Sequence, residues 1–528
     1  MTTPCLSSGI SDPSHRLVQS LQSPSAYNHP VDNIRLLETH ISWVILTGRY
    51  AYKLKKPVNL GFLDFSTLER RRFYCLEEIR LNRRLAPEIY IGVVPITGTP
   101  EAPSMAGTGN PIEFAVQMCE FPQEALLSHV LQRRELMPHH IDALAREIAG
   151  FHSRIEIASP NSPFGNPEVV RQTTEESLAH LMPGDQSNAL VEHIKSWCQT
   201  EFEARRDEFL RRKQRGFVRE CHGDMHLGNM LLLDGRPVLF DCIEFNERFR
   251  WIDVLSEVAF TVMDLEDRGN RAAARRFLSE YLEETGDYSG LSVFRYYLVY
   301  RALVRAKVTS IRLDQEDILP DERKALLTEY DGYVELAERY TRPPQPILAI
   351  THGPSGSGKS TVAEAVVEEL GAIRVRSDVE RKRLLGLKPL ERTAHKAADV
   401  YSAAATDRTY ARLAELACAA VRAGYSAVAD ATFLKRSQRQ QFQRLATQLD
   451  VPFAILDLQA SETDLRQRVT ERAMAGSDAS DADLAVLAQQ LATRELLDEE
   501  EQACTIPVSS DQPRAAATAM LAHCSRCP

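Results

Sequence analysis

The 528-residue sequence contains no hydrophobic run long enough to cross a membrane, because it has no stretch of about 18 apolar residues. Its first twenty residues are polar and lack the apolar segment of a secretory signal peptide. Positive charge is not in excess either: the formal net charge is −10, whereas nucleic-acid-binding proteins usually carry a basic domain. We therefore expect a cytoplasmic protein without membrane contact, and we do not favour nucleic acid as a partner, although a local basic groove remains compatible with this charge.

The ten cysteines are scattered along the chain and form no regular framework. We expect Cys221 and Cys242 to behave as small buried hydrophobic residues. With 44% hydrophobic and 26% charged residues, the composition is that of an ordinary globular protein. The length exceeds what one core usually accommodates and suggests roughly three to four units of about 150 residues.

A proline-rich segment divides the chain. Residues 341–346 read Thr-Arg-Pro-Pro-Gln-Pro, which favours a short, stiff, extended linker. Before it, extended segments (about 33–60, 88–97 and 112–118) precede a helical region, which predicts a sheet-rich lobe followed by a helical lobe. After it, short apolar strands (347–350, 372–375, 426–429, 452–456 and 505–508) alternate with helices, which predicts a parallel sheet covered on both faces. We predict a tail (1–30), a first α+β domain (31–340), the linker (341–346) and an α/β domain (347–528).

A glycine-rich loop follows the first strand of the second domain and opens a helix. Its residues, together with the next one, are Gly353, Pro354, Ser355, Gly356, Ser357, Gly358, Lys359, Ser360 and Thr361. They match the P-loop pattern, in which backbone N–H groups converge on phosphate oxygens at a helix N-terminus. Lys359 is expected to reach the β- and γ-phosphates of ATP, and the Ser360 hydroxyl to bind Mg²⁺.

Two acids and two arginines accompany this loop. Asp378 and Asp430 stand at strand ends, where α/β sheets build their sites. We expect Asp430 to hold the Mg²⁺ shell and Asp378 to accept the proton of a substrate hydroxyl; a helix N-cap is the alternative for either. Arg468 and Arg472 share one helix face, as a pair that closes over the triphosphate or as a solvated basic face.

Residues 347–510 resemble the P-loop kinase group that includes polynucleotide kinase, zeta-toxin-type kinases and small-metabolite kinases. The resemblance rests on GPSGSGKST, the RSD that ends the second strand, DAT at 430–432 and the late arginine-rich helix. It implies phosphorylation of a hydroxyl group and does not specify which one.

A second constellation lies in the first domain. Asp224 and Asn229 belong to His-Gly-Asp-Met-His-Leu-Gly-Asn (222–229), and a hairpin turning at Asp234-Gly235 is expected to bring Asp241 beside Asn229. An acid, an asparagine five residues later and a second acid repeat the protein-kinase catalytic pattern. Asp224 would orient or deprotonate the acceptor hydroxyl, and Asn229 and Asp241 would hold Mg²⁺.

A lysine is also needed for the α- and β-phosphates. Lys53 and Lys55 lie in one extended segment and share a face. We favour Lys53, with Lys55 as the alternative, and we expect its acidic partner to be Glu78 rather than Glu77. The alternative interpretation is that these lysines protect an edge strand.

Residues of about 30–340 resemble the aminoglycoside phosphotransferase family, on the strength of HGDMHLGN and of FDCIEFNERFRWIDVLSEVAF. The tandem order resembles a bacterial group described as bifunctional aminoglycoside phosphotransferase/ATP-binding proteins. Family kinship implies a protein-kinase-like bilobal fold, an adenine-binding hinge over 114–121 and a structural or substrate-facing role for Asp253.

The sequence thus predicts a bifunctional phosphotransferase that uses ATP and Mg²⁺ on small hydroxylated molecules. One alternative gives the second domain a nucleotide or nucleic-acid acceptor, read by a basic cluster (Arg374, Arg376, Arg381, Lys382 and Arg383) near Asp378. Another makes one domain a nucleotide sensor that regulates the other. The sequence does not indicate the acceptors or the oligomeric state.

Overall fold

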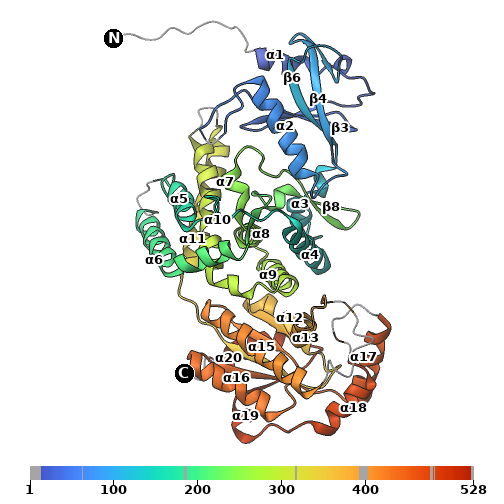
Figure 1. The fold of residues 1–528 in the computed structure, drawn as a ribbon, viewed down its shortest axis with the longest axis vertical. Coiled ribbons are helices and arrows are strands. Elements are labelled where there is room, and N and C mark those ends of the chain that lie inside the picture. The colour runs from blue at the N-terminus through green and yellow to red at the C-terminus, as the bar shows by residue number, and fades with distance from the viewer. Residues whose placement is uncertain are drawn as a thin grey trace. The chain divides into compact units, whose positions relative to one another are not determined.

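The structure, a computed structural model, describes residues 13–61, 63–182, 187–314, 318–389, 391, 402–475, 480 and 482–524. It divides into two compact units. The first contains the described residues up to His140 together with Phe151–Phe164 and Gly216–Glu257; the second contains Ile141–Gly150, Gly165–Arg215 and the described residues from Val258 onward. Figure 1 labels their elements. No helix in these described ranges is long and apolar enough to cross a membrane.

A six-stranded sheet dominates the first unit, with the order β1-β2-β3-β6-β4-β5 and antiparallel pairing throughout. Its strands are β1 (Arg35–Glu38), β2 (Ser42–Leu46), β3 (Tyr50–Lys55), β4 (Tyr90–Thr99), β5 (Ala102–Met105) and β6 (Glu113–Cys119). One face packs on α1 (Pro13–Ser20) through Trp43, Ile45 and Tyr52. The other packs on α2 (Leu68–Asn82) through Val116, Cys75 and Ile79. Alternation of side chains along β3 therefore directs Lys53 and Lys55 to one face of the sheet, the α2 face.

The rest of this unit includes several short elements. They are η1 (Pro24–Ala26), η2 (Gln123–Ala125), α3 (Leu127–Gln132), β7 (Val218–Glu220), η3 (Leu227–Asn229), β8 (Met230–Leu233), β9 (Arg236–Leu239), α7 (Glu247–Arg250) and β10 (Trp251–Asp253). β8 and β9 form the predicted hairpin, and Asp234 and Gly235 at its turn both have positive φ, 50° and 74°. β7 pairs with β10.

The second unit begins with helices. They are α4 (Pro138–Arg154), α5 (Pro167–Leu178), α6 (Ser187–Gln214), α8 (Val254–Asp267), α9 (Arg271–Thr285), η4 (Tyr288–Gly290), α10 (Leu291–Leu313) and α11 (Pro320–Thr341). Helices α4 and α8 each contain residues of both units. Buried aromatic residues pack between α6 and α10: Phe202 and Phe209 stack, and Tyr296 packs tilted against Phe202 and edge-on against Phe209. Helix α9 packs on α12, so it belongs to the same compact unit as the α/β layer that follows.

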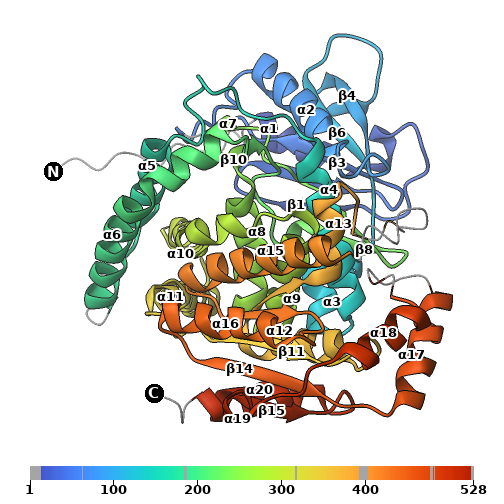
Figure 2. The ribbon, with the colours of Figure 1, turned by 60° about the horizontal axis from the view of Figure 1, so that its bottom comes forward.

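That layer is a five-stranded parallel sheet with the order β12-β13-β11-β14-β15. Its strands are β11 (Leu348–His352), β12 (Ile373–Arg376), β13 (Ala427–Asp430), β14 (Phe453–Leu458) and β15 (Thr505–Val508). Its helices are α12 (Lys359–Leu370), α13 (Ser377–Leu384), α15 (Ala403–Arg422), α16 (Arg436–Leu449), α17 (Glu462–Ala475), α18 (Leu484–Thr493), α19 (Glu499–Ala503) and α20 (Pro513–Cys524). Helices α12 and α20 pack together on the sheet, as do α15 and α16, and Figure 2 shows them around β11 and β14. Because β11 is central, its C-terminal loop opens at the middle of the sheet edge.

The predicted fold class is confirmed, a bilobal α+β region followed by a parallel α/β sheet. Each predicted strand after residue 346 is present and begins and ends within two residues of its expected bounds. Most residues of β11, β12, β13 and β14 are buried, whereas the edge strand β15 is only partly covered. The residues of the proline-rich linker connect α11 to β11, and the domain boundaries drawn from it stay a prediction.

Candidate active sites

Both candidate lysines of β3 are charged partners of one carboxylate. Lys53 Nζ lies 2.9 Å from Glu78 Oε1, and Lys55 Nζ donates to Glu78 Oε2 at 2.7 Å. Burial alone would raise the pKa of Glu78, but attraction by Lys53 and Lys55 outweighs it and holds that pKa below its usual range. Glu78 on α2 is thus the acid that the lysines share, and Glu77 instead pairs with Arg80.

The two lysines differ in their second partner. Lys53 Nζ donates to Asp241 Oδ1 at 2.5 Å, whereas Lys55 donates to Glu244 and lies 5.0 Å from the centre of the Phe65 ring. The Lys55 side chain is 1% exposed and Lys53 12% exposed, while Asp241 is 40% exposed. Lys53 therefore faces the open side of the site with the candidate metal carboxylate, and Lys55 is enclosed beneath it.

The hairpin brings the candidate catalytic residues together. Asn229 Nδ2 donates to Asp224 Oδ2 at 3.0 Å and to the Asp224 carbonyl at 3.0 Å, and Phe240 N donates to the Asn229 carbonyl at 3.0 Å. Asp241 follows directly, in a left-handed conformation with φ 65°, and its N–H donates to Tyr90 Oη at 3.1 Å. Carboxylate and amide oxygens are among the ligands that Mg²⁺ takes in proteins. Asn229 and Asp241 thus offer donors suited to Mg²⁺, and Asp224 lies beside Asn229.

Buried groups hold the loop that carries Asp224. Glu257 accepts from the backbone N–H groups of His222 (3.1 Å) and Gly223 (2.6 Å), and it pairs with His152 Nε2 at 3.0 Å. Burial would raise the pKa of Glu257, but these bonds from His152 and Gly223, with the His222 charge, lower it to about 2. His222 Nε2 lies 2.8 Å from the Phe240 carbonyl, so it joins the loop of Asp224 to the segment of Asp241.

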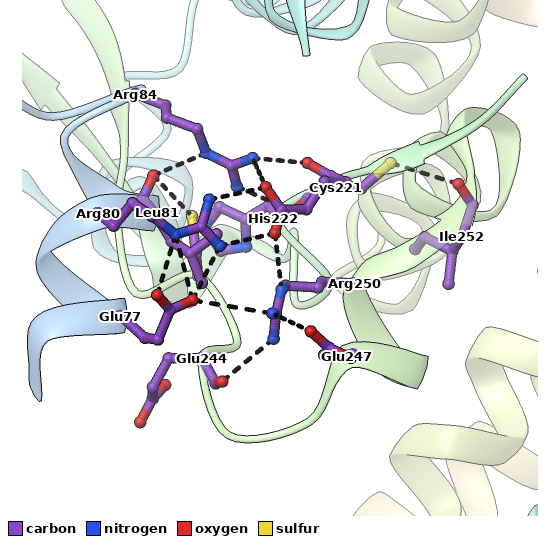
Figure 3. Close-up of polar contacts among 12 residues, drawn as sticks. Glu77, Arg80, Leu81, Arg84, Cys221, His222, Glu244, Glu247, Arg250 and Ile252 are labelled. Carbon is purple, nitrogen blue, oxygen red and sulfur yellow. Dashed lines mark hydrogen bonds and ion pairs between the residues drawn. The ribbon is translucent and has the colours of Figure 1, made fainter. Parts of the chain in front are cut away.

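One carboxylate ties α2 to the same loop. Glu220, the last residue of β7, pairs with Arg80 at 2.7 Å and with Arg250 at 3.1 Å, and Arg84 donates to its backbone carbonyl at 2.7 Å. In Figure 3 the guanidinium groups of Arg80, Arg84 and Arg250 converge in front of Cys221 and His222. The helix that supplies Glu78 is therefore fixed to the strand that leads into the catalytic loop.

The P-loop closes tightly around its glycines. Gly356 and Gly358 have φ of 86° and 91°, and a Cβ atom at Gly358 would lie 2.4 Å from Cβ of Ser510. Only glycine tolerates both a positive φ and such a close neighbouring atom without strain. Lys359, the first residue of α12, donates through Nζ to the Pro354 carbonyl at 2.7 Å. This bond links the loop to the start of the helix.

The polar residues predicted from the motif line one cavity of about 460 Å³; they include Ser360, Asp378, Asp430, Arg468 and Arg472. Burial lowers the pKa of Lys359 to about 8, although Asp430 and Asp378 oppose this effect. The Ser360 hydroxyl hydrogen-bonds to Asp430, whose Oδ2 atom is buried and has no hydrogen-bond partner in the described part of the chain. That orphaned carboxylate oxygen beside a serine hydroxyl fits a bound cation.

The remaining predicted residues also lie at this cavity. Arg468 Nη1 lies 3.2 Å from Ser510 Oγ and 3.4 Å from the Gly356 carbonyl, and Arg472 donates to the Ala482 carbonyl at 3.0 Å. Asp378 lies in the first turn of α13, 3.4 Å from Arg381, and does not cap the helix, whose N-cap is Arg376. Gln490 of α18 accepts from Ser355 N at 2.8 Å, a contact that no motif indicated.

Asp253 caps α8 by accepting from Leu255 N at 2.9 Å and is 4% exposed, so it lies in a structural position.

Sequence reasoning missed three acids that support the site. Glu220, Glu244 and Glu257 are each buried, although acids on helices and loops usually face solvent. Glu220 and Glu244 lie within a few residues of the predicted motif residues His222 and Asp241, whereas Glu257 lies 16 positions after Asp241. Cys221 and Cys242 are fully buried, as predicted.

Two protein families match the chain. Residues 75–294 match the phosphotransferase enzyme family, and residues 348–497 match an AAA domain family. The first match contains Glu78, Asp224, Asn229 and Asp241; the second contains the P-loop, Asp378, Asp430 and both arginines of α17. These matches indicate a nucleotide-binding phosphotransferase with an aminoglycoside-phosphotransferase-like region and a P-loop kinase-like region.

Solved structures of kinases resemble parts of the chain. A gluconokinase from Sinorhizobium meliloti is 26% identical and covers 35% of this chain and 94% of its own, with a TM-score of 0.24. A choline/ethanolamine kinase family protein from Mesorhizobium loti is 12% identical over 62% of this chain and 99% of its own (TM-score 0.35). An ADP-bound aminoglycoside phosphotransferase is 15% identical over 63% of this chain and 99% of its own (TM-score 0.32).

Relatives that match most of the chain occur in mycobacteria. Uncharacterized proteins from Mycobacterium tuberculosis and Mycobacterium bovis are 30% identical to the chain over 476 residues, which is 88% of this chain and 92% of theirs. The chain therefore belongs to the family of these mycobacterial proteins. In this chain a phosphotransferase-family region is followed by a P-loop kinase-like region.

Proposed function

We propose that the protein is a bifunctional phosphotransferase with two ATP sites, each of which transfers phosphate to a hydroxyl group of a small molecule. The observation that carries the first site is the group of Lys53, Glu78 and Asp241 beside Asp224. A lysine neutralised by two acids is positioned before ATP arrives, and nucleotide binding moves it from Asp241 to phosphate oxygens. Such positioning, with electrostatic stabilisation, accounts for most of the catalysis in phosphoryl transfer.

In this first site Asp224 accepts the proton of the acceptor hydroxyl, and Asn229 holds the Asp224 carboxylate in place. Asn229 and Asp241 would hold Mg²⁺, which supplies the positive charge that neutralises the transferring phosphoryl group. Lys53 binds the α- and β-phosphates. The 114–121 segment, which includes most of β6, is proposed as the adenine hinge.

In the second site the P-loop amides and Lys359 bind the phosphates of ATP, and Ser360 and Asp430 would hold Mg²⁺. Asp378 is the proposed proton acceptor because it lines the same cavity. Arg468 and Arg472 approach from α17 and are proposed to stabilise charge on the phosphates. The volume of about 460 Å³ suits a small acceptor together with part of a nucleotide.

A small molecule is favoured over nucleic acid as the acceptor. In the basic cluster, Arg374, Arg381 and Lys382 are at most 9% exposed, and Arg383 pairs with Glu380. Guanidinium groups that are buried and paired with acids do not present an open surface to a phosphate backbone. A cytoplasmic location fits ATP-dependent chemistry.

The test is a screen of hydroxylated acceptors with γ-labelled ATP on the full chain. Lys359→Ala leaves only the first site, and Lys53→Ala leaves only the second. Transfer to at least one small acceptor is expected from each variant. If both variants bind ATP and neither phosphorylates an acceptor of any class, a nucleotide sensor replaces the enzyme; if oligonucleotide ends are the preferred acceptor of the Lys53→Ala variant, the second site is a polynucleotide kinase.

A further inference from the structure

A bulge at the start of β4 turns one tyrosine toward the first site. Between Tyr90 and Gly92 the pairing of β4 with β6 shifts, so Ile91 is an extra residue in the strand. Beyond the shift, Ile96 packs on the α1 face of the sheet, whereas Tyr90 packs on the α2 face. In a regular strand these two residues, an even number of positions apart, would share a face. The bulge therefore re-aims Tyr90, as bulges beside active sites often do.

The bulge is held by an arginine at the end of α2. Arg83, the C-cap residue of that helix, donates through Nε to the Tyr90 carbonyl at 3.0 Å and through Nη2 to the Ile91 carbonyl. Tyr90 is 1% exposed, whereas Ile91 is 39% exposed. The bulge thus buries the tyrosine on the side of Lys53 and leaves the isoleucine next to it at the surface.

The Tyr90 hydroxyl bonds to the backbone of the candidate metal carboxylate. Asp241 N donates to Tyr90 Oη at 3.1 Å, and the N–H of the next residue, Cys242, donates to Asn82 Oδ1 at 2.9 Å. Asp241 has a φ of 65°, in the left-handed region that residues other than glycine occupy at a cost. Such a conformation persists where the surrounding structure fixes it. Side chains from β4 and α2 therefore hold this strained turn of the chain.

Backbone and side chain of Asp241 are held by different groups. The backbone N–H is bonded to Tyr90, and the carboxylate is paired with Lys53 Nζ at 2.5 Å on the open side of the site. In the proposed reaction Lys53 moves to the phosphate oxygens when the nucleotide binds. The carboxylate then loses its charged partner, and the hydrogen bonds to the backbone keep its direction.

We propose that Tyr90 is a positioning residue of the first site: its hydroxyl fixes the backbone of Asp241 and so directs the Asp241 carboxylate toward Mg²⁺. This inference rests on the proposed function of the first site. It follows that removal of the hydroxyl alone weakens the binding of Mg²⁺ with the nucleotide, because Asp241 then leaves its strained conformation more easily.

The test measures how much Mg²⁺ a fluorescent ATP analogue needs to bind to the full chain, with Lys359→Ala removing the second site. Tyr90→Phe should raise the half-saturating Mg²⁺ concentration about tenfold, the change that corresponds to the loss of one buried hydrogen bond. At saturating Mg²⁺ the affinity for the analogue should stay within about twofold of the parent, because excess metal restores binding by mass action. Excess metal does not repair a damaged fold, so this recovery separates positioning from a structural role.

Tyr52→Phe is the matched control. Tyr52 lies on β3, is 2% exposed and packs on the opposite, α1 face of the same sheet. Its hydroxyl bonds to His29 Nε2 at 2.9 Å and to Gln117 Nε2 at 3.2 Å. The control variant thus loses an equally buried hydroxyl away from Asp241, and it should change the Mg²⁺ requirement less than about twofold.

If Tyr90→Phe does not fold, Arg83→Met carries the test, because it releases the carbonyls of the bulge and keeps the tyrosine. It should raise the Mg²⁺ requirement about threefold. The inference is wrong if the variant tested leaves the requirement unchanged, if saturating Mg²⁺ brings no recovery, or if Tyr52→Phe has the same effect. If the Lys359→Ala parent shows no Mg²⁺-dependent binding, the proposed function of the first site is refuted, and the inference with it.

Discussion

The two lysines proposed to bind phosphate have opposite electrostatic environments, so the two sites should respond differently to pH. Burial lowers the pKa of Lys359 to about 8, because Asp430 and Asp378 only partly offset it. Burial also acts on Lys53, but Asp241 and Glu78 outweigh it and raise the pKa of Lys53 well above its usual value. Lys359 therefore loses its proton as the pH rises through about 8, and Lys53 keeps its proton.

The size of the effect follows from the titration. A group with a pKa of about 8 is roughly nine-tenths protonated at pH 7 and about one-tenth protonated at pH 9. Only the protonated amine attracts the phosphates, whose last pKa of about 6 makes them about nine-tenths fully charged at pH 7 and almost entirely so at pH 9. ATP affinity at the P-loop should therefore fall about tenfold between pH 7 and pH 9, or about 1.4 kcal/mol. Affinity at the first site should change little.

Titration of a fluorescent ATP analogue at constant free Mg²⁺ checks this. The Lys53→Ala variant reports on the P-loop, and the Lys359→Ala variant reports on the first site. Lys359→Arg, added to Lys53→Ala, is the control because a guanidinium does not deprotonate in this range. The reasoning fails if the Arg variant shows the same loss of affinity, or if both sites weaken equally with pH.

Three further outcomes are expected in the first site. Asp224→Asn, in a Lys359→Ala chain, should slow phosphate transfer by about 10²–10⁴ and leave the ATP affinity unchanged, because the residue acts on the acceptor proton; full activity would mean that Asp224 is not the base. Asp241→Asn should abolish Mg²⁺-dependent ATP binding there, as measured by titration, and unchanged binding would remove Asp241 from the metal site. Lys55→Met should destabilise the fold by about 3–5 kcal/mol in urea unfolding, since Glu78 and Glu244 lose a buried partner; wild-type stability would contradict this account.

The sequence predicted those parts of the site whose geometry is set by residues close together in the chain. The P-loop needs positive φ at Gly356 and Gly358 within a few residues of Lys359, and the Asp234-Gly235 turn places Asp241 near Asn229 without help from the rest of the chain. The inner strands of the α/β layer, β11, β13 and β14, were predictable because their apolar runs are buried.

What sequence did not predict depends on contacts between distant residues. Lys53 and Lys55 point to the same face of their strand, so alternation along the strand does not tell them apart. They differ in their second partners, Asp241 and Glu244, each more than 180 positions away. Glu283 of α9 likewise accepts from Arg374 of β12 across about 90 positions. Acids that neutralise buried bases at such separations carry no periodic or motif signal, so they resemble ordinary surface residues.

The Glu220 cluster has a consequence for regulation. In protein kinases, activity is controlled by the position of the helix that carries the lysine's acidic partner. Here that helix, α2, is held through Arg80 and Arg84 to Glu220 and to the Cys221 carbonyl, one residue before His222. An outward swing of α2 would leave Glu220, a buried carboxylate, with Arg250 as its remaining charged partner among the described residues. We therefore expect a regulator of this enzyme to act by occupying its nucleotide or acceptor position instead of by displacing α2.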